Sequence, residues 1–132
     1  MITHIHHINF LVSDLETAVH QYEKLPGIGP FEFDQLEQRA VKTAKTRLGD
    51  AWLVLVQPVD QNSIPAKHLA EHGEGFFLLS LATDDLNNSI DIINNQKIEC
   101  QGEQRAGLDK WQVQDLDANA FFGTQIQITQ DN

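Results

Sequence analysis

Three of the six histidines in this sequence lie within its first seven residues: His4, His6 and His7. Histidine suits acid/base chemistry near neutral pH, and it is also a common metal ligand. Side chains alternate between the faces of a strand, so we expect His6 and His7 on opposite faces. His4 should precede the strand, where a frayed terminus makes a poor ligand. His7 is therefore the candidate catalytic residue, although the sequence supplies no obvious carboxylate to orient it.

The other candidate side chains are better explained structurally. His68 and His72 are four residues apart with Glu71 between them, which superficially resembles a pair of metal ligands on one helix face. We interpret that segment as a solvated polar helix, and His20 as a surface residue of an earlier helix. Cys100 is expected to be an inert strand residue, because no basic neighbour in sequence would lower its pKa.

The first half of the chain predicts a strand, a helix and three further strands. Residues 5–12 alternate and are rich in Ile, Phe and Val. Ser13 or Asp14 can cap a helix that ends before Leu25. Extended segments follow at about 31–36, 39–48 and 51–57.

The second half repeats this order of elements. A strand is predicted at 78–82, then a helix capped within residues 83–85, then extended segments at about 98–104, 111–116 and 124–129. A shift of 71 residues (86 − 15) places Leu15 on Leu86 and Val19 on Ile90. The sequence thus predicts an α+β fold built from two copies of a βαβββ unit.

The two copies are expected to form one domain over residues 1–132. The first copy spans about 1–60 and the second about 74–132, with a connecting helix at about 62–73. Ser63 suits the N-cap of that helix, Pro65 its first turn and Gly73 its end. One cysteine permits no internal disulfide, and no secretory signal or membrane-spanning run is evident, so the expected location is the cytoplasm.

The composition narrows the class of partner. Apolar residues make up 41% of the chain and charged residues 21%, as in ordinary globular proteins. The net charge of −10 repels phosphate backbones and anionic lipids. Nucleic acids and membranes are therefore not expected as partners, whereas a small molecule remains possible.

Several short segments, in their order and spacing, resemble a known family. They are His7-Ile8, Val12-Ser13-Asp14-Leu15, Gly27-Ile28-Gly29-Pro30-Phe31, Leu48-Gly49-Asp50, Leu55-Val56-Gln57-Pro58, His72-Gly73-Glu74-Gly75 and Asp84-Asp85-Leu86. Over nearly its full length the chain resembles the vicinal oxygen chelate superfamily of glyoxalases, bleomycin-resistance proteins and extradiol dioxygenases. The closest likeness is to methylmalonyl-CoA epimerase-like glyoxalase domains. The resemblance implies a curled mixed sheet around a cleft, and a homodimer.

Enzymes of this family hold a divalent metal with two side chains from each copy of the unit. The resemblance places these ligands at His7, Val54, Leu78 and Gln127. The internal repeat also pairs His7 with Leu78 (7 + 71 = 78). Valine and leucine offer no lone pair, whereas catalytic metal sites usually keep three protein ligands. We therefore expect no metal and no other cofactor.

The resemblance also implies what an epimerase would need. Two carboxylate bases should flank the acidic carbon, and the matching positions are Gln127 and about Thr43. Neither side chain is a carboxylate. Epimerisation of methylmalonyl-CoA is therefore not expected.

The cleft that remains is predicted to be apolar and aromatic with a few neutral hydrogen-bonding groups. It is lined by His7, Asn9, Trp52, Val54, Leu78, Ser80, Gln125 and Gln127. Such a surface fits a small, mainly apolar organic ligand. Alternatively, these side chains simply fill the space of a lost metal and substrate. Trp111 could close the cleft, lie in a dimer interface or be exposed at a strand edge.

Three functions remain open. The first is a metal-independent protein that binds a small molecule, in the manner of the bleomycin-resistance members. The second is a lyase or isomerase of the glyoxalase or epimerase type, with a displaced metal site or with acid/base chemistry at His7. The third is a structural role in which paired units form a dimer.

Overall fold

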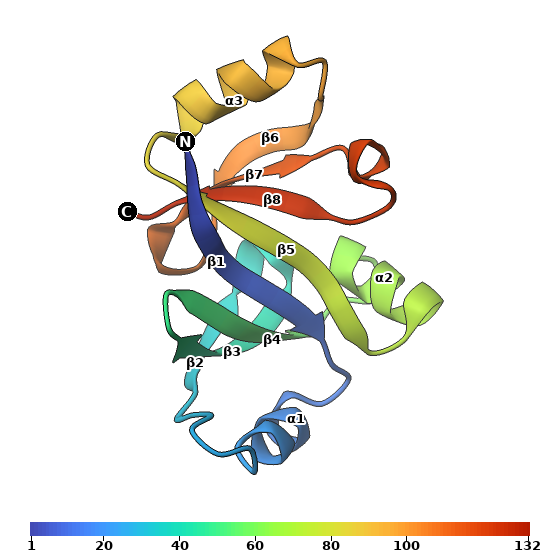
Figure 1. Cartoon of the computed structure of the whole chain (residues 1–132). Coiled ribbons are helices and arrows are strands. Elements are labelled where there is room, and N and C mark those ends of the chain that lie inside the picture. The colour runs from blue at the N-terminus through green and yellow to red at the C-terminus, as the bar shows by residue number, and fades with distance from the viewer. The chain divides into compact units, whose positions relative to one another are not determined.

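The computed structural model describes residues 1–132, which form eight strands and three α-helices (Figure 1). In chain order the elements are β1 (Ile2–Leu11), α1 (Leu15–Tyr22), β2 (Glu32–Leu36), β3 (Val41–Leu48), β4 (Ala51–Pro58), α2 (Ile64–His72), β5 (Gly75–Thr83), α3 (Leu86–Asn95), β6 (Cys100–Ala106), β7 (Gln112–Leu116) and β8 (Ile126–Gln130). The predicted order β-α-β-β-β occurs twice, on either side of the predicted connecting helix. The α+β fold class is thus confirmed.

Several strand boundaries differ from the sequence prediction by two or three residues. β1 begins at Ile2, so His4 lies within the strand and not before it. β3 begins only at Val41, because a 3-10 turn at Glu37–Arg39 is followed by Ala40 in the left-handed region (φ 54°). No helix is long and apolar enough to cross a membrane.

The chain groups into two compact units, which we call the N-terminal unit (Ile8–Phe77) and the C-terminal unit (Met1–His7 with Leu78–Asn132). β2, β3 and β4 are consecutive antiparallel neighbours in the N-terminal unit. Helix α1 contributes Leu15 and Val19 to a core that also contains Ala44 and Leu55. The apolar spacing that predicted this helix is therefore the spacing of its buried face.

The C-terminal unit is built on the same plan. β5 runs parallel to β8, and β8, β7 and β6 follow as antiparallel neighbours. Helix α3 contributes Leu86 to a core with Leu116, Ile126 and Ile128. In both units, one face of the helix thus packs against the strand side chains that point toward it, which are every second residue of a strand.

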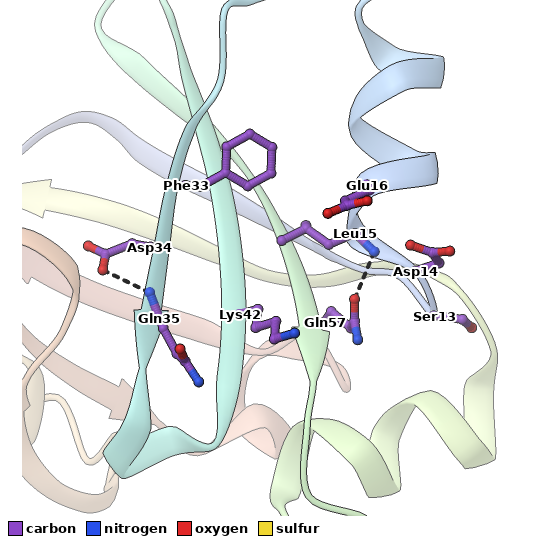
Figure 2. Close-up of a pocket in the computed structure, with 9 residues that line it drawn as sticks. All are labelled: Ser13, Asp14, Leu15, Glu16, Phe33, Asp34, Gln35, Lys42 and Gln57. Carbon is purple, nitrogen blue, oxygen red and sulfur yellow. Dashed lines mark hydrogen bonds between the residues drawn. The ribbon is translucent and has the colours of Figure 1, made fainter.

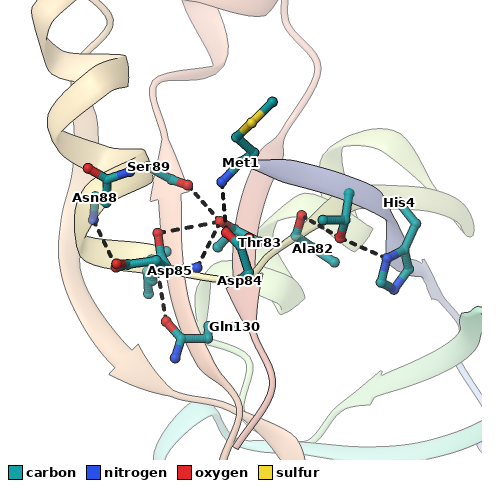
Figure 3. A network of polar contacts seen from close by, with 11 residues as sticks. Met1, His4, Ala82, Thr83, Asp84, Asp85, Asn88, Ser89 and Gln130 are labelled. Atoms are coloured by element: carbon teal, nitrogen blue, oxygen red, sulfur yellow. Dashed lines mark hydrogen bonds and ion pairs between the residues drawn. The ribbon is translucent and has the colours of Figure 1, made fainter.

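The two helix starts are held by equivalent contacts, which supports the duplication. In α1, Asp14 is the N-cap and the Oε1 atom of Gln57 accepts from the Leu15 N–H at 2.8 Å (Figure 2). In α3, Asp85 is the N-cap and the Oε1 atom of Gln130 accepts from the Leu86 N–H at 2.7 Å (Figure 3). Each contact satisfies a helix-terminal N–H that has no partner within its own helix.

This equivalence gives a structural alignment of the two units. Gln57 corresponds to Gln130, so the positions three residues earlier, Val54 and Gln127, also correspond. They are the two closing-strand positions that the family resemblance had singled out.

We predict that Gln57→Ala and Gln130→Ala each lower the free energy of unfolding by about 1–2 kcal/mol, because each leaves a helix-terminal N–H without its partner. Urea denaturation at neutral pH measures this effect. Gln112→Ala, at an exposed position of β7, is the matched control and should change stability by less than about 0.5 kcal/mol. A loss in only one of the two variants would contradict the equivalence of the two contacts.

Candidate functional site

Two buried histidines and one tryptophan form the centre of the candidate site in the C-terminal unit. His6 and His7 are 2% and 4% exposed, and Trp111 is 5% exposed. The Trp111 ring stacks on His7, with centroids 5.1 Å apart and planes at 22°, and it meets His6 edge-on at 4.5 Å. Of the three roles considered for Trp111, an exposed edge position is therefore wrong.

His6 and His7, which were predicted to lie on opposite faces of the strand, are in contact. Their Nδ1 atoms are 2.8 Å apart, which is a hydrogen-bond distance between the two rings. Alternation sets the direction of each Cβ atom, but an imidazole extends well beyond Cβ. Here both rings turn toward the same indole.

A carboxylate completes this chain of contacts. The Nε2 atom of His6 lies 2.8 Å from Oδ1 of Asp131, which follows β8 at the C-terminal end of the chain. The Asp131 side chain is 66% exposed, so the chain of contacts Asp131–His6–His7 runs from the surface to a buried ring. No orienting carboxylate for His7 was evident in the sequence, but the fold supplies one through His6.

The surroundings of His7 hold it neutral. The pKa of His7 is lowered from 6.5 to about 3, chiefly by burial and to a smaller extent by the positive charge that His6 can carry. A hydrogen bond with the Gln127 side chain opposes this shift but does not overcome it. A buried imidazole without its own counter-ion is expected to behave in this way.

Gln127 links His7 to a second chain of polar side chains. Its Nε2 atom donates to Oδ1 of Asp115 at 3.1 Å, and its Oε1 atom accepts from the Thr129 hydroxyl at 3.3 Å. The Thr129 hydroxyl in turn lies 2.5 Å from that of Ser80, and both residues are fully buried. The predicted residues His7, Ser80 and Gln127 are therefore brought into one network.

An ion pair terminates this network. Nη1 of Arg105 donates to Oδ2 of Asp115 at 2.6 Å, and the two side chains are 26% and 15% exposed. Asp115 lies directly opposite Gln127 in the β7–β8 register, so its side chain shares the face of Gln127. The prediction of an electrically neutral surface at this position is wrong.

A second ion pair occupies the corresponding place in the N-terminal unit. Lys45 lies directly opposite Val54 in the β3–β4 register and is 3% exposed. Its ammonium group pairs with Glu32 and also lies 4.0 Å from the centroid of the Trp52 ring. The face of Val54 is therefore also charged and not neutral.

The remaining predicted residues are distributed over both units. Val54 and Leu78 are buried, at 1% and 5% exposure, while Trp52 and Gln125 are partly exposed. Asn9 is partly buried, and its Oδ1 atom is buried without a hydrogen-bond partner. A buried acceptor in this state usually has a structural or functional reason.

The remaining histidines and the cysteine, which were explained structurally from the sequence, lie outside the chain of contacts around His7. His20 is exposed, as expected of a surface helix residue. The His68 and His72 rings are 4.3 Å apart, and His68 also packs against Phe77. No group of three or more His, Cys, Asp or Glu side chains is arranged to hold a metal ion. Burial raises the pKa of Cys100, so its thiol is not activated.

A separate groove of about 680 Å³ lies in the N-terminal unit beside the start of α1 (Figure 2). It is lined by Ser13, Asp14, Leu15, Glu16, Phe33, Asp34, Gln35, Lys42 and Gln57. None of the eight predicted cleft residues belongs to it. Gln35, Lys42 and Gln57 lie opposite one another on β2, β3 and β4, on the face that carries α1.

The chain is similar to known proteins in sequence and in fold. A sequence profile of the Glyoxalase/Bleomycin resistance protein/Dioxygenase superfamily matches residues 6–114. No curated protein matches the sequence significantly.

Three solved structures illustrate the likeness in fold. Methylmalonyl-CoA epimerase from Mycobacterium tuberculosis is 21% identical with a TM-score of 0.93, over 99% of this chain and 89% of that chain. A variant of Streptomyces coelicolor methylmalonyl-CoA epimerase in complex with 2-nitronate-propionyl-CoA is 23% identical with a TM-score of 0.91, over 99% and 96%. A hypothetical protein from Bacillus halodurans C-125 is 19% identical with a TM-score of 0.92, over 97% and 94%.

At these identities the structures show a shared fold and not a shared activity. The sequence profile covers most of the chain, and the duplicated βαβββ units agree with it. The chain therefore belongs to the glyoxalase/bleomycin resistance protein/dioxygenase superfamily.

Proposed function

We propose that this protein binds a small, mainly apolar organic molecule without a metal ion. The observation that carries the proposal is the chemistry of the four family ligand positions. Val54 and Leu78 are buried hydrocarbon side chains. The Gln127 amide already bonds to Asp115 and Thr129. His7 alone does not reach the three protein ligands that a catalytic metal site usually has.

Two features support a ligand that carries a polar group. The Oδ1 atom of Asn9 is a buried acceptor without a protein donor, and leaving such an atom unpaired costs about 1–3 kcal/mol. Lys45 and Asp115 add one positive and one negative charge to the faces of Val54 and Gln127. The ligand that we propose is thus a mainly apolar molecule with at least one hydrogen-bonding group.

Metal content and a thermal-shift screen test this function. Protein purified without a metal-affinity tag should carry far less than one divalent ion per chain, and a chelator should leave its melting temperature unchanged. A library of apolar metabolites should contain compounds that stabilise it, by about 1.4 kcal/mol at ten times the dissociation constant.

The matched variants are Asn9→Ala, which removes the buried acceptor, and Asn62→Ala, at an exposed position. Compounds found in the screen should bind Asn9→Ala more weakly and Asn62→Ala unchanged. One divalent ion per chain, or no stabilising compound at all, would contradict the proposal.

A second candidate function is metal-free acid/base catalysis at His7, as in a lyase or isomerase. The chain of contacts Asp131–His6–His7 favours it, because a general base needs a partner that orients its ring. Epimerisation of methylmalonyl-CoA, after which two of the similar structures named above are called, is not proposed. Gln127 and Thr43 stand where the resemblance requires carboxylates, and Asp115 is already paired with Arg105.

We also propose that the protein is a homodimer, as the family resemblance implies. Sedimentation velocity at micromolar concentration distinguishes a dimer from a monomer.

A further inference from the structure

We propose that Asp131 and His6 are positioning residues that fix the tautomer of His7, so that His7 Nε2 acts as a hydrogen-bond acceptor for the bound molecule. The ligand would accordingly be an organic molecule with an O–H or N–H donor. This inference rests on the proposed function for the ligand, but its first part concerns the unliganded protein alone.

The tautomers follow from the donors and acceptors in the chain of contacts. An ionised carboxylate only accepts hydrogen bonds, so the 2.8 Å contact between Asp131 and His6 places a proton on Nε2 of His6. In a neutral imidazole the other nitrogen then carries a lone pair, so Nδ1 of His6 is an acceptor. The 2.8 Å contact between the two Nδ1 atoms then requires the proton of His7 to lie on its Nδ1. Nε2 of a neutral His7 is left with a lone pair.

The packing keeps the rings in this arrangement. Trp111 contacts both imidazoles, stacked on His7 and edge-on to His6, and all three side chains are buried. Rotation of either ring would break an Nδ1 contact and disturb this packing. A ring oriented by a chain of hydrogen bonds to a carboxylate is how proteins select a histidine tautomer.

Gln127 also hydrogen-bonds with His7. Its amide nitrogen donates to Asp115, and its amide oxygen accepts from Thr129. Because the Gln127 amide has these two other partners, a ligand donor can take its place at His7 without leaving the amide unpaired. A methylated analogue of the same ligand has no proton to donate and would leave Nε2 of His7 unsatisfied.

The decisive experiment reads the tautomers directly. Protein labelled with ¹⁵N at histidine is measured at pH 8 by long-range ¹H–¹⁵N correlation, which distinguishes protonated from bare ring nitrogens. We expect a protonated Nδ1 and a bare Nε2 for His7, and a protonated Nε2 for His6. A His7 ring protonated on Nε2 would overturn the proposal.

Variants test the part played by Asp131. Asp131→Ala should give mixed tautomers for both rings, because it removes the acceptor that fixes His6. Asp84→Ala is the control, since Asp84 is a carboxylate of the same unit with similar exposure and pairs with the N-terminal amine instead (Figure 3). Unchanged tautomers in Asp131→Ala would show that Asp131 does not position the rings.

A matched pair of probes tests the acceptor role. We expect 2-naphthol to shift the Nε2 resonance of His7 and to bind about tenfold more tightly than 2-methoxynaphthalene, which lacks the O–H donor. Equal binding of the two would refute the acceptor role while leaving the proposed small-molecule function intact. If neither probe binds, the inferred ligand class is wrong, and the tautomers still report separately on the positioning residues.

Discussion

Acidification from pH 7 to pH 5 should lower the free energy of unfolding by about 2 kcal/mol through His7 alone. Burial lowers the pKa of this histidine from 6.5 to about 3 in the folded protein. Between these two values the unfolded chain binds one proton more than the native protein does. Stability therefore rises with pH across this window and falls on acidification, to a total loss on the order of 4 kcal/mol near pH 3.

The measurement is urea denaturation at a series of pH values for the wild type and for His7→Asn. The variant removes the titrating group but keeps a polar atom close to the position of Nδ1. From pH 7 to pH 5 its stability should fall by about 2 kcal/mol less than that of the wild type, whatever its absolute value at pH 7. His20→Asn, at an exposed histidine, should retain the wild-type slope. A wild-type slope in His7→Asn would show that another group causes the acid sensitivity.

Loss of the Arg105 guanidinium should be the most destabilising change to a charge in the C-terminal unit. Arg105→Met should cost about 2–3 kcal/mol at pH 7, because it leaves the Asp115 carboxylate without its cation while that side chain remains only 15% exposed. Methionine keeps most of the aliphatic stem, so the loss reports on the charge and not on the packing.

The double variant Arg105→Met/Asp115→Leu should recover most of this loss, since removing both charges of a poorly hydrated pair is far less costly than removing one. Lys67→Met is the control, because Lys67 is an exposed cation on α2. Urea denaturation at fixed pH gives all four free energies. If Arg105→Met is as stable as Lys67→Met, the ion pair contributes nothing measurable.

Much of the fold could be predicted because its signals are local. The caps at Asp14 and Asp85, the helical spacing of Leu15 and Val19, and the shift of 71 residues between Leu15 and Leu86 all come from short segments or from their repetition. The start of β3 lies two residues later than predicted. The strand begins after Ala40, which adopts the left-handed region. Alanine rarely does so, and the sequence therefore does not indicate this conformation.

The site was less predictable because its contacts join distant parts of the chain. Asp131 bonds to His6 across 125 residues, which no local pattern encodes. Lys45 and Asp115 became part of the site only through strand register, which places them opposite Val54 and Gln127. If the register of β3 with β4 and of β7 with β8 had been predicted from the sequence, Lys45 and Asp115 would have been identified as neighbours of Val54 and Gln127.

The two ion pairs also bear on how a duplicated chain folds correctly. Equivalent strands of two similar units can compete for the same partners during folding. Without a difference between the units, exchanging β3 for β7 would cost little free energy. Lys45 pairs with Glu32 in one unit, whereas Asp115 pairs with Arg105 in the other, with the signs reversed. A strand exchange would bring Lys45 to Arg105 and Asp115 to Glu32, and like charges in such contacts are destabilising. The reversed order of charges in the two ion pairs thus favours pairing of each strand within its own unit.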